Sequence, residues 1–169
     1  MQQLVFIRGG EAFDTMEDYY KFLQEFPYDP FAQGESRRTW LAERVMTTHQ
    51  FICPDMPCKQ NATYRARKIW FEKLFPYLND EGVILVGYSL GGRFLAKYLS
   101  EEMFPKRIAQ LHLVATPLDA EGVEGEWTAD FGFDKALLPR IGEQVEQVFV
   151  YHSIDDDIVP YRHVETFQR

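Results

Sequence analysis

Short apolar runs separated by longer amphipathic segments constrain the fold of this chain more than any other feature. Five runs are predicted to be strands, and their lack of strict apolar–polar alternation is typical of strands buried on both faces: residues 4–7, 51–53, 83–86, 111–115 and 148–151. The segments between them carry apolar residues at three- and four-residue spacing, which predicts helices. We therefore expect an α/β fold with a mostly parallel sheet and helices on both faces.

Helix boundaries are indicated by capping residues and prolines. A helix is expected to begin at Asp14 or Thr15, where a capping side chain precedes two acids, and further helices begin near residue 36 and after residues 89 and 160. Another helix is expected over 61–75, with Ile69 and Trp70 on its apolar face. Residues 116–135 break this pattern with glycines and acids, which indicates a loop or a small lid.

Composition excludes several classes of function. The chain of 169 residues fits one domain, and its net charge of −8 argues against a nucleic-acid binder. No apolar run reaches the roughly 20 residues that span a bilayer, and no signal peptide precedes the first strand, so we expect no membrane partner and a cytoplasmic location. Cys53 and Cys58 are expected to be reduced thiols, and no metal or cofactor is implied.

The strongest functional signal is the sequence Gly-Tyr-Ser-Leu-Gly-Gly at 87–92, between the strand at 83–86 and a helix. A serine in a sharp strand-to-helix turn exposes its hydroxyl, and the glycines let the turn close without a Cβ clash. We expect Ser89 to be a nucleophile and the N–H of Leu90 to donate to an oxyanion. A glycine-rich turn without chemistry is the alternative.

Two further parts of a hydrolase site can be sought at other strand ends. A second oxyanion donor should come from the loop after the first strand, where Arg-Gly-Gly-Glu stands at 8–11. Gly10 is the candidate, and an ordinary tight turn is the alternative. The acid should follow a later strand, and the run at 148–151 leads into three adjacent aspartates at 155–157. One of these is expected to be the acid.

With these motifs the chain resembles the α/β-hydrolase family, especially small bacterial proteins similar to the retinoblastoma-binding serine hydrolases. The resemblance covers essentially the whole chain and is most specific at 87–92 and 152–160; relatives commonly carry histidine where Arg8 stands. In this family the catalytic aspartate lies three residues before the valine of a Val-Pro pair, which implies Asp156. The two neighbouring aspartates are then turn and capping residues.

The resemblance also implies a triad histidine after a further helix and strand, but the chain ends soon after Asp156. We therefore expect the last strand and helix of the fold to be lacking, and favour a truncated chain over a shortened, inactive relative. The chain's histidines are expected to be structural, with the last at the surface or at a helix cap: His49, His112, His152 and His163.

These expectations combine into one functional hypothesis and one alternative. We expect a single α/β-hydrolase-like domain over 1–169 that cleaves a small-molecule ester, thioester or amide through an acyl-enzyme on Ser89. Without a base, the chain itself should hydrolyse activated esters very slowly or not at all. The alternative is a catalytically silent protein that binds a partner through the same cleft or through 116–135. An encoded extension with a histidine would favour the enzyme, and a natural stop after Arg169 would favour the binding protein.

Overall fold

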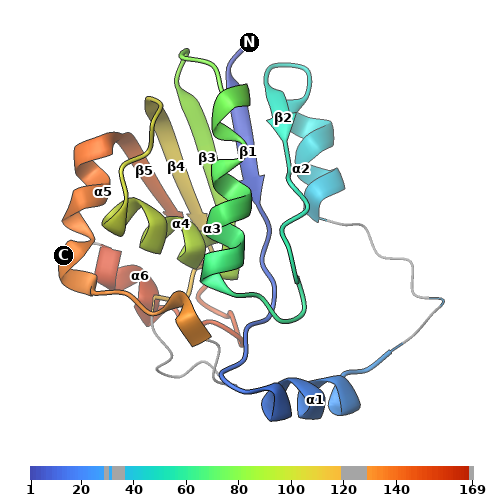
Figure 1. Cartoon of the computed structure of the whole chain (residues 1–169). Coiled ribbons are helices and arrows are strands. Elements are labelled where there is room, and N and C mark those ends of the chain that lie inside the picture. The colour runs from blue at the N-terminus through green and yellow to red at the C-terminus, as the bar shows by residue number, and fades with distance from the viewer. Residues whose placement is uncertain (29–30, 32–36, 119–128, 168–169) are drawn as a thin grey trace.

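The five expected strands form one parallel sheet (Figure 1). The structure is a computed structural model that describes residues 1–28, 31, 37–118 and 129–167. The strand order is β2-β1-β3-β4-β5, and each neighbouring pair is parallel. The strand bounds are β1 Gln3–Ile7, β2 Gln50–Ile52, β3 Val83–Tyr88, β4 Ile108–Val114 and β5 Val145–Tyr151. The predicted fold class is therefore confirmed.

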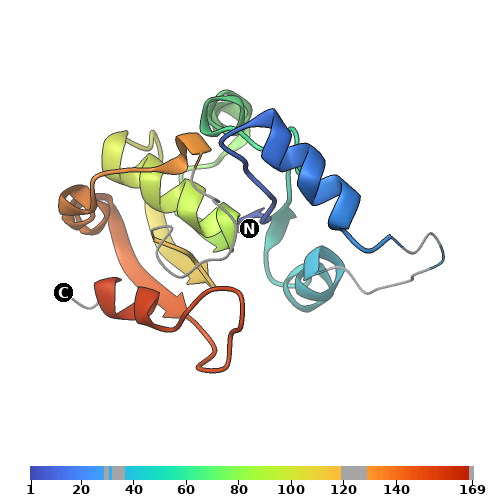
Figure 2. The same cartoon turned by 90° about the horizontal axis from the view of Figure 1, so that it is seen from below.

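Helices lie on both faces of this sheet, as Figure 2 shows in a view onto the carboxyl ends of the strands. One face is covered by α3 (Tyr64–Glu72), α4 (Leu90–Glu101) and α5 (Pro139–Gln144). The other face carries α2 (Arg37–Val45) and α6 (Arg162–Phe167). Short 3-10 turns are η1 (Phe75–Tyr77), η2 (Ala129–Phe131) and η3 (Lys135–Leu137). The sequence did not indicate α5.

The strand order reverses between β1 and β3. The chain runs from β1 to β2 on one side and then returns to the other side of β1 as β3. At such a point the loops that leave the carboxyl ends of the two strands diverge, and this is where open α/β sheets bind ligands. The loop after β1 and the turn at Ser89 both lie there.

The larger core lies between the sheet and α4. This helix is buried from Leu90 to Ser100. Aromatic rings join α4 to α3, with the Phe71 ring 5.3 Å from that of Phe94 and 5.2 Å from that of Tyr98, both edge-on. Because α4 is packed along its whole length, the position of its first residue beside the strand ends is fixed.

The buried face of α3 differs from the sequence-based prediction. Ile69 and Trp70 were expected to face the core, but they are 53% and 45% exposed. Arg67 and Phe71 are the buried residues of the helix. The helix is turned so that the large Phe71 ring fills the aromatic cluster, and this turn takes the Arg67 side chain inward as well.

The helix α1 (Met16–Glu25) lies below the carboxyl ends of the strands (Figure 1). Its N-cap is Thr15, whose hydroxyl accepts from the Asp18 N–H, so the expected helix start is confirmed. The helix buries none of its residues, and its rings pack locally, with Phe22 and Phe26 5.0 Å apart. Within the described ranges, no helix has the length and apolar character needed to cross a bilayer.

Candidate active site

Ser89 lies in a strained turn between β3 and α4. Its φ is 52° and its ψ is −123°, a backbone conformation that residues with a side chain rarely adopt. The Ser89 N–H donates to the Val114 carbonyl at the end of β4, at 2.9 Å. The carbonyl of Ser89 accepts from the N–H groups of Gly92 and Arg93 in the first turn of α4. These bonds hold the serine at the strand end in the conformation expected for a nucleophile turn.

The glycines around Ser89 are required by close contacts. A Cβ on Gly91 would lie 2.1 Å from the Ile7 carbonyl oxygen at the end of β1. A Cβ on Gly92 would lie 1.9 Å from Oγ1 of Thr116, just after β4. The start of α4 therefore packs directly on the ends of both neighbouring strands, and only glycine fits at either position.

Leu90 is the first residue of α4. Its side chain is 1% exposed in the core, so the position of its backbone is fixed. The N–H of the first residue of a helix has no acceptor within the helix, and the positive end of the helix dipole lies there. The Leu90 amide next to Ser89 is therefore suited to donate a hydrogen bond to an anion.

The loop after β1 lies against Ser89. A Cβ on Gly9 would be 3.2 Å from Cβ of Ser89, whereas a Cβ on Gly10 would meet Lys59 and Arg67 at 2.6 and 2.5 Å. The glycine whose Cβ position faces the serine is thus Gly9, which the sequence did not single out. Gly10, the predicted oxyanion donor, follows it in the same loop.

Arg8 stands at the start of this loop, directly after β1. Its Nη2 lies 2.6 Å from Oδ1 of Asp55, which belongs to the segment between β2 and α3. The Arg8 side chain is 31% exposed and that of Asp55 is 78% exposed, so water screens this ion pair and it adds little stability. It fastens the loop after β1 to the neighbouring segment.

Asp156 lies in the loop after β5, at the same edge of the sheet as Ser89. Its Oδ1 accepts from the N–H groups of Ile158 and Val159 at 3.0 and 2.9 Å. These two bonds fix the carboxylate and leave Oδ2, which lies 3.6 Å from Nε2 of His152. The other two aspartates of the loop are exposed, whereas the Asp156 side chain is 17% exposed.

Two histidines stabilise the region around β5. The Nε2 of His152 is 2.6 Å from the Val159 carbonyl oxygen, and because a carbonyl only accepts, this nitrogen carries the proton. The His112 ring on β4 stacks on the rings of Phe149 and Tyr151, with centroids 4.8 and 5.8 Å apart. Both histidines therefore have structural contacts, as the sequence predicted.

The other two histidines also lie in contacts of their own. His49 precedes β2, at the amino edge of the sheet, and its Nδ1 is 2.8 Å from the Thr48 hydroxyl. His163 was expected at the surface or at a cap, but it is 2% exposed. Its Nδ1 accepts from the Leu118 N–H at 3.2 Å, because α6 packs back onto the segment that follows β4. The surface assignment of His163 is therefore wrong.

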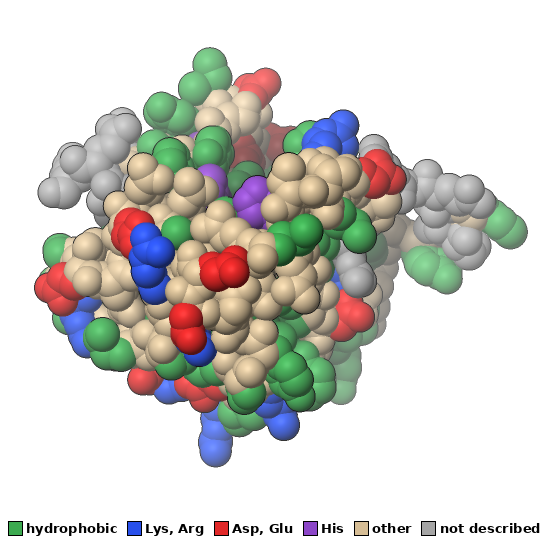
Figure 3. Space-filling view, turned by 90° about the horizontal axis from the view of Figure 1, so that it is seen from above, with side chains coloured by type: hydrophobic (Ala, Val, Ile, Leu, Met, Phe, Trp, Pro, Cys, Tyr) green, Lys and Arg blue, Asp and Glu red, His purple; other side chains and the backbone are tan. Residues whose placement is uncertain are grey.

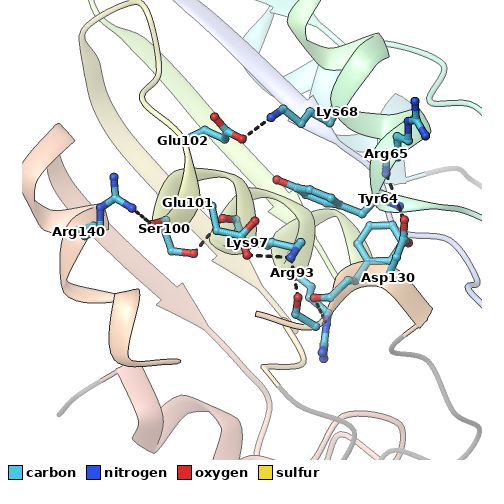
Figure 4. Close-up of polar contacts among 12 residues, drawn as sticks. Tyr64, Arg65, Lys68, Arg93, Lys97, Ser100, Glu101, Glu102, Asp130 and Arg140 are labelled. Carbon is cyan, nitrogen blue, oxygen red and sulfur yellow. Dashed lines mark hydrogen bonds and ion pairs between the residues drawn. The ribbon is translucent and has the colours of Figure 1, made fainter. Parts of the chain in front are cut away.

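The far end of the expected lid is attached to α3 and α4 (Figure 4). The carboxylate of Asp130 accepts from the N–H groups of Tyr64 and Arg65 at 2.6 and 3.3 Å, which caps α3. Arg93 of α4 donates to the Phe131 carbonyl at 3.2 Å and to the Pro117 carbonyl at 3.5 Å. Residues 119–128 lie outside the described residues, so a lid at 116–135 remains a prediction.

A pocket lies at the opposite edge of the sheet, where the strands begin. An open pocket of about 490 Å³ lies there, lined by Met1, Met46, His49, Gln50, Phe51 and Asn79. Figure 3 looks onto this edge, and acidic and basic side chains lie interspersed on it. Within the described ranges, no group of three or more histidine, cysteine or acidic side chains is arranged to hold a metal ion.

Known proteins share the sequence pattern and the fold of this chain. The sequence matches the family described as alpha/beta hydrolase fold over residues 28–169, and no curated protein matches. The structure is similar to the ydeN gene product from B. subtilis, with a TM-score of 0.69 at 17% identity over 99% of this chain and 82% of that one.

Two esterase structures are also similar. For the esterase domain from a Rhodothermus marinus protein, the TM-score is 0.56 at 12% identity over 98% of this chain and 69% of that one. For the carboxylesterase Cest-2923 from Lactobacillus plantarum WCFS1, the values are 0.59, 16%, 99% and 65%. Structural similarity at such low identity establishes the fold alone. The family match spans most of the chain, and the chain therefore belongs to the alpha/beta hydrolase fold family.

Proposed function

We propose that this chain is a serine hydrolase that cleaves a carboxylic ester, thioester or amide through an acyl-enzyme on Ser89. The observation that carries the proposal is the backbone of Ser89, with φ at 52° directly between a buried strand and a buried helix. A strained conformation persists only where the surrounding structure enforces it, and such residues cluster at active sites. The Ser89 side chain makes no capping hydrogen bond at the start of α4, so helix capping does not explain a serine there.

In the proposed reaction, the Ser89 hydroxyl attacks the substrate carbonyl and loses its proton to a base, while the carbonyl oxygen becomes an oxyanion. The N–H groups of Leu90 and Gly10 donate to that oxyanion. The leaving group departs with a proton, and water then releases the acid from Ser89. Asp156 is the acid that orients the base, because its Oδ1 is fixed by two N–H groups and its Oδ2 is available.

Among the described residues, which include all four histidines, no histidine is hydrogen-bonded to the Ser89 hydroxyl. At least one ring nitrogen of each histidine bonds to another group. Serine without a neighbouring base is a poor nucleophile at neutral pH. This observation favours a second candidate, a catalytically silent member of the family that uses the crevice at Ser89 to bind a partner.

Hydrolysis of p-nitrophenyl butyrate with and without free imidazole separates the two candidates. As an enzyme, the chain should hydrolyse the ester slowly, and imidazole should accelerate the reaction because it can act as the base. Ser89→Ala should abolish the part of this acceleration that exceeds the rate with imidazole and no protein, and Asp156→Asn should reduce that part because an amide orients imidazolium poorly. Ser153→Ala and Asp155→Asn, which change exposed residues of the same loop, are the matched controls.

The outcome that contradicts the proposal is specific. If Ser89→Ala hydrolyses the ester as fast as the original chain at every imidazole concentration, Ser89 is not the nucleophile. The binding protein then becomes the better account of the crevice.

A further inference from the structure

Arg67 is a fully buried cation with no carboxylate partner. It projects from α3 with 0% of its surface exposed, and among the described residues no acidic side chain forms an ion pair with it. Burial and the nearby charge of Arg8 lower the pKa of Arg67 to about 10, so the group is still protonated at neutral pH. An unpaired buried charge destabilises a fold, so core packing alone does not explain this arginine.

The hydrogen bonds of Arg67 are to backbone carbonyls only. Its Nη1 donates to the carbonyl oxygen of Arg8 and its Nη2 to that of Gly9, each at 3.2 Å. In a planar trans peptide the C=O and the following N–H point in opposite directions. The N–H groups of Gly9 and Gly10 therefore both point away from Arg67, on the same side of the loop.

Two successive N–H groups that point to the same side form a concavity that binds anions. None of the described residues accepts a hydrogen bond from the N–H of Gly9 or of Gly10, whereas the next amide, that of Glu11, donates to the Lys59 carbonyl at 2.9 Å. The concavity lies near the proposed nucleophile, because even a Cβ added to Gly9 would lie 3.2 Å from Cβ of Ser89.

We propose that Arg67 is a positioning residue: it holds the carbonyls of Arg8 and Gly9 so that the N–H groups of Gly9 and Gly10 are aimed at the oxyanion of a substrate on Ser89. The inference rests on the proposed function, and it adds Gly9 as a donor and Arg67 as the group that orients both amides. Only the transition state carries the full negative charge on oxygen, so the loop should affect the rate of acylation more than ester binding.

The test is the rate at which p-nitrophenyl butyrate acylates Ser89, followed by intact-mass spectrometry over a range of ester concentrations. Arg67→Gln should lower the maximal rate by about 10- to 100-fold and leave the half-saturating concentration unchanged. Arg67→Lys should lower the maximal rate by a smaller factor, because an ammonium group can still donate to one of the two carbonyls.

Two control variants separate positioning from general loss of stability. Arg65→Gln removes an exposed arginine from the same helix and should acylate at the original rate. Ile141→Val weakens the core at α5, away from α3 and from the loop after β1, and it should lower the urea midpoint without lowering the acylation rate.

Each outcome discriminates between the proposals. If the original chain acylates Ser89 and Arg67→Gln does so equally fast, the inference about Arg67 is wrong while the proposed function stands. A similar slowing in Ile141→Val, at matched stability, would also overturn it. If the original chain never acquires a butyryl group on Ser89, the proposed function fails and this inference fails with it.

Discussion

The contact between Gly92 and Thr116 gives a quantitative test of how the turn at Ser89 is built. A Cβ added at Gly92 would lie 1.9 Å from Oγ1 of Thr116, 3.0 Å from its Cβ and 3.1 Å from its Cγ2. Rotation of the threonine side chain gives only partial relief, because its Cβ, which the rotation does not move, already lies 3.0 Å away. Thr116 is 2% exposed, so the surrounding structure cannot easily move away.

Gly92→Ala should therefore destabilise the protein. Overpacking of this kind costs about 1–3 kcal/mol, and the better helix propensity of alanine offsets up to about 1 kcal/mol. We expect a net loss of about 1–2 kcal/mol. In a Thr116→Ala background the Oγ1 and Cγ2 contacts are gone and Cβ at 3.0 Å remains, so the same substitution should cost less than in the original chain. The coupling energy of the pair should be about 1 kcal/mol.

Urea unfolding of the two single variants and the double variant, followed by tryptophan fluorescence, measures this coupling. Gly142→Ala is the control, because no atom lies within 4 Å of its Cβ position and alanine should be neutral or slightly stabilising in α5. Additive losses in the double variant would show that α4 does not press against the end of β4 as described.

Three further predictions concern other parts of the structure. Ser89→Gly should unfold at a higher urea midpoint than Ser89→Ala, by about 1 kcal/mol in free energy, because glycine relieves the positive φ. Asp130→Ala should lower the free energy of unfolding by about 1 kcal/mol through loss of the α3 cap. Asp130→Asn should lower it less, because the amide oxygen still accepts a hydrogen bond from an N–H group of α3. Burial lowers the pKa of His112, so the unfolded chain binds the proton more readily and stability is lost as pH falls from about 6.5. In His112→Phe, which keeps a ring against Phe149, the urea midpoint should therefore fall less than in the original chain between about pH 7.5 and about pH 5.

Much of the fold could be predicted from the sequence because buried parallel strands leave a strong pattern. The runs at 83–86 and 148–151 are apolar and short, and their neighbours carry helical spacing, so strands and helices could be assigned without knowledge of packing. The turn at Ser89 could also be predicted, because glycines stand on both sides of the serine between a strand and a helix, and glycine allows the backbone to pack closely there. The prediction missed α5, which has only six residues and a glycine within it.

Helix rotation and the partners of buried polar groups could not be predicted. Ile69 and Trp70 fit an apolar stripe as well as Phe71 does, and only the aromatic cluster of α4 decides which of them turns inward. An arginine on a helix is normally exposed, so nothing in the sequence indicated that Arg67 reaches the loop after β1. His163 was misplaced because its burial depends on how α6 folds back onto Leu118.

The most direct test of the central claim is to trap the acyl-enzyme. Without a base, release of the acyl group should be even slower than its transfer from an activated ester, so the intermediate should accumulate. After incubation with p-nitrophenyl butyrate, intact-mass spectrometry should find one butyryl group per chain, and peptide mapping should locate it on Ser89. Ser89→Ala should lack this adduct. An equal yield of adduct in Ser89→Ala, or butyryl groups spread over lysines and tyrosines with none on Ser89, would contradict the account.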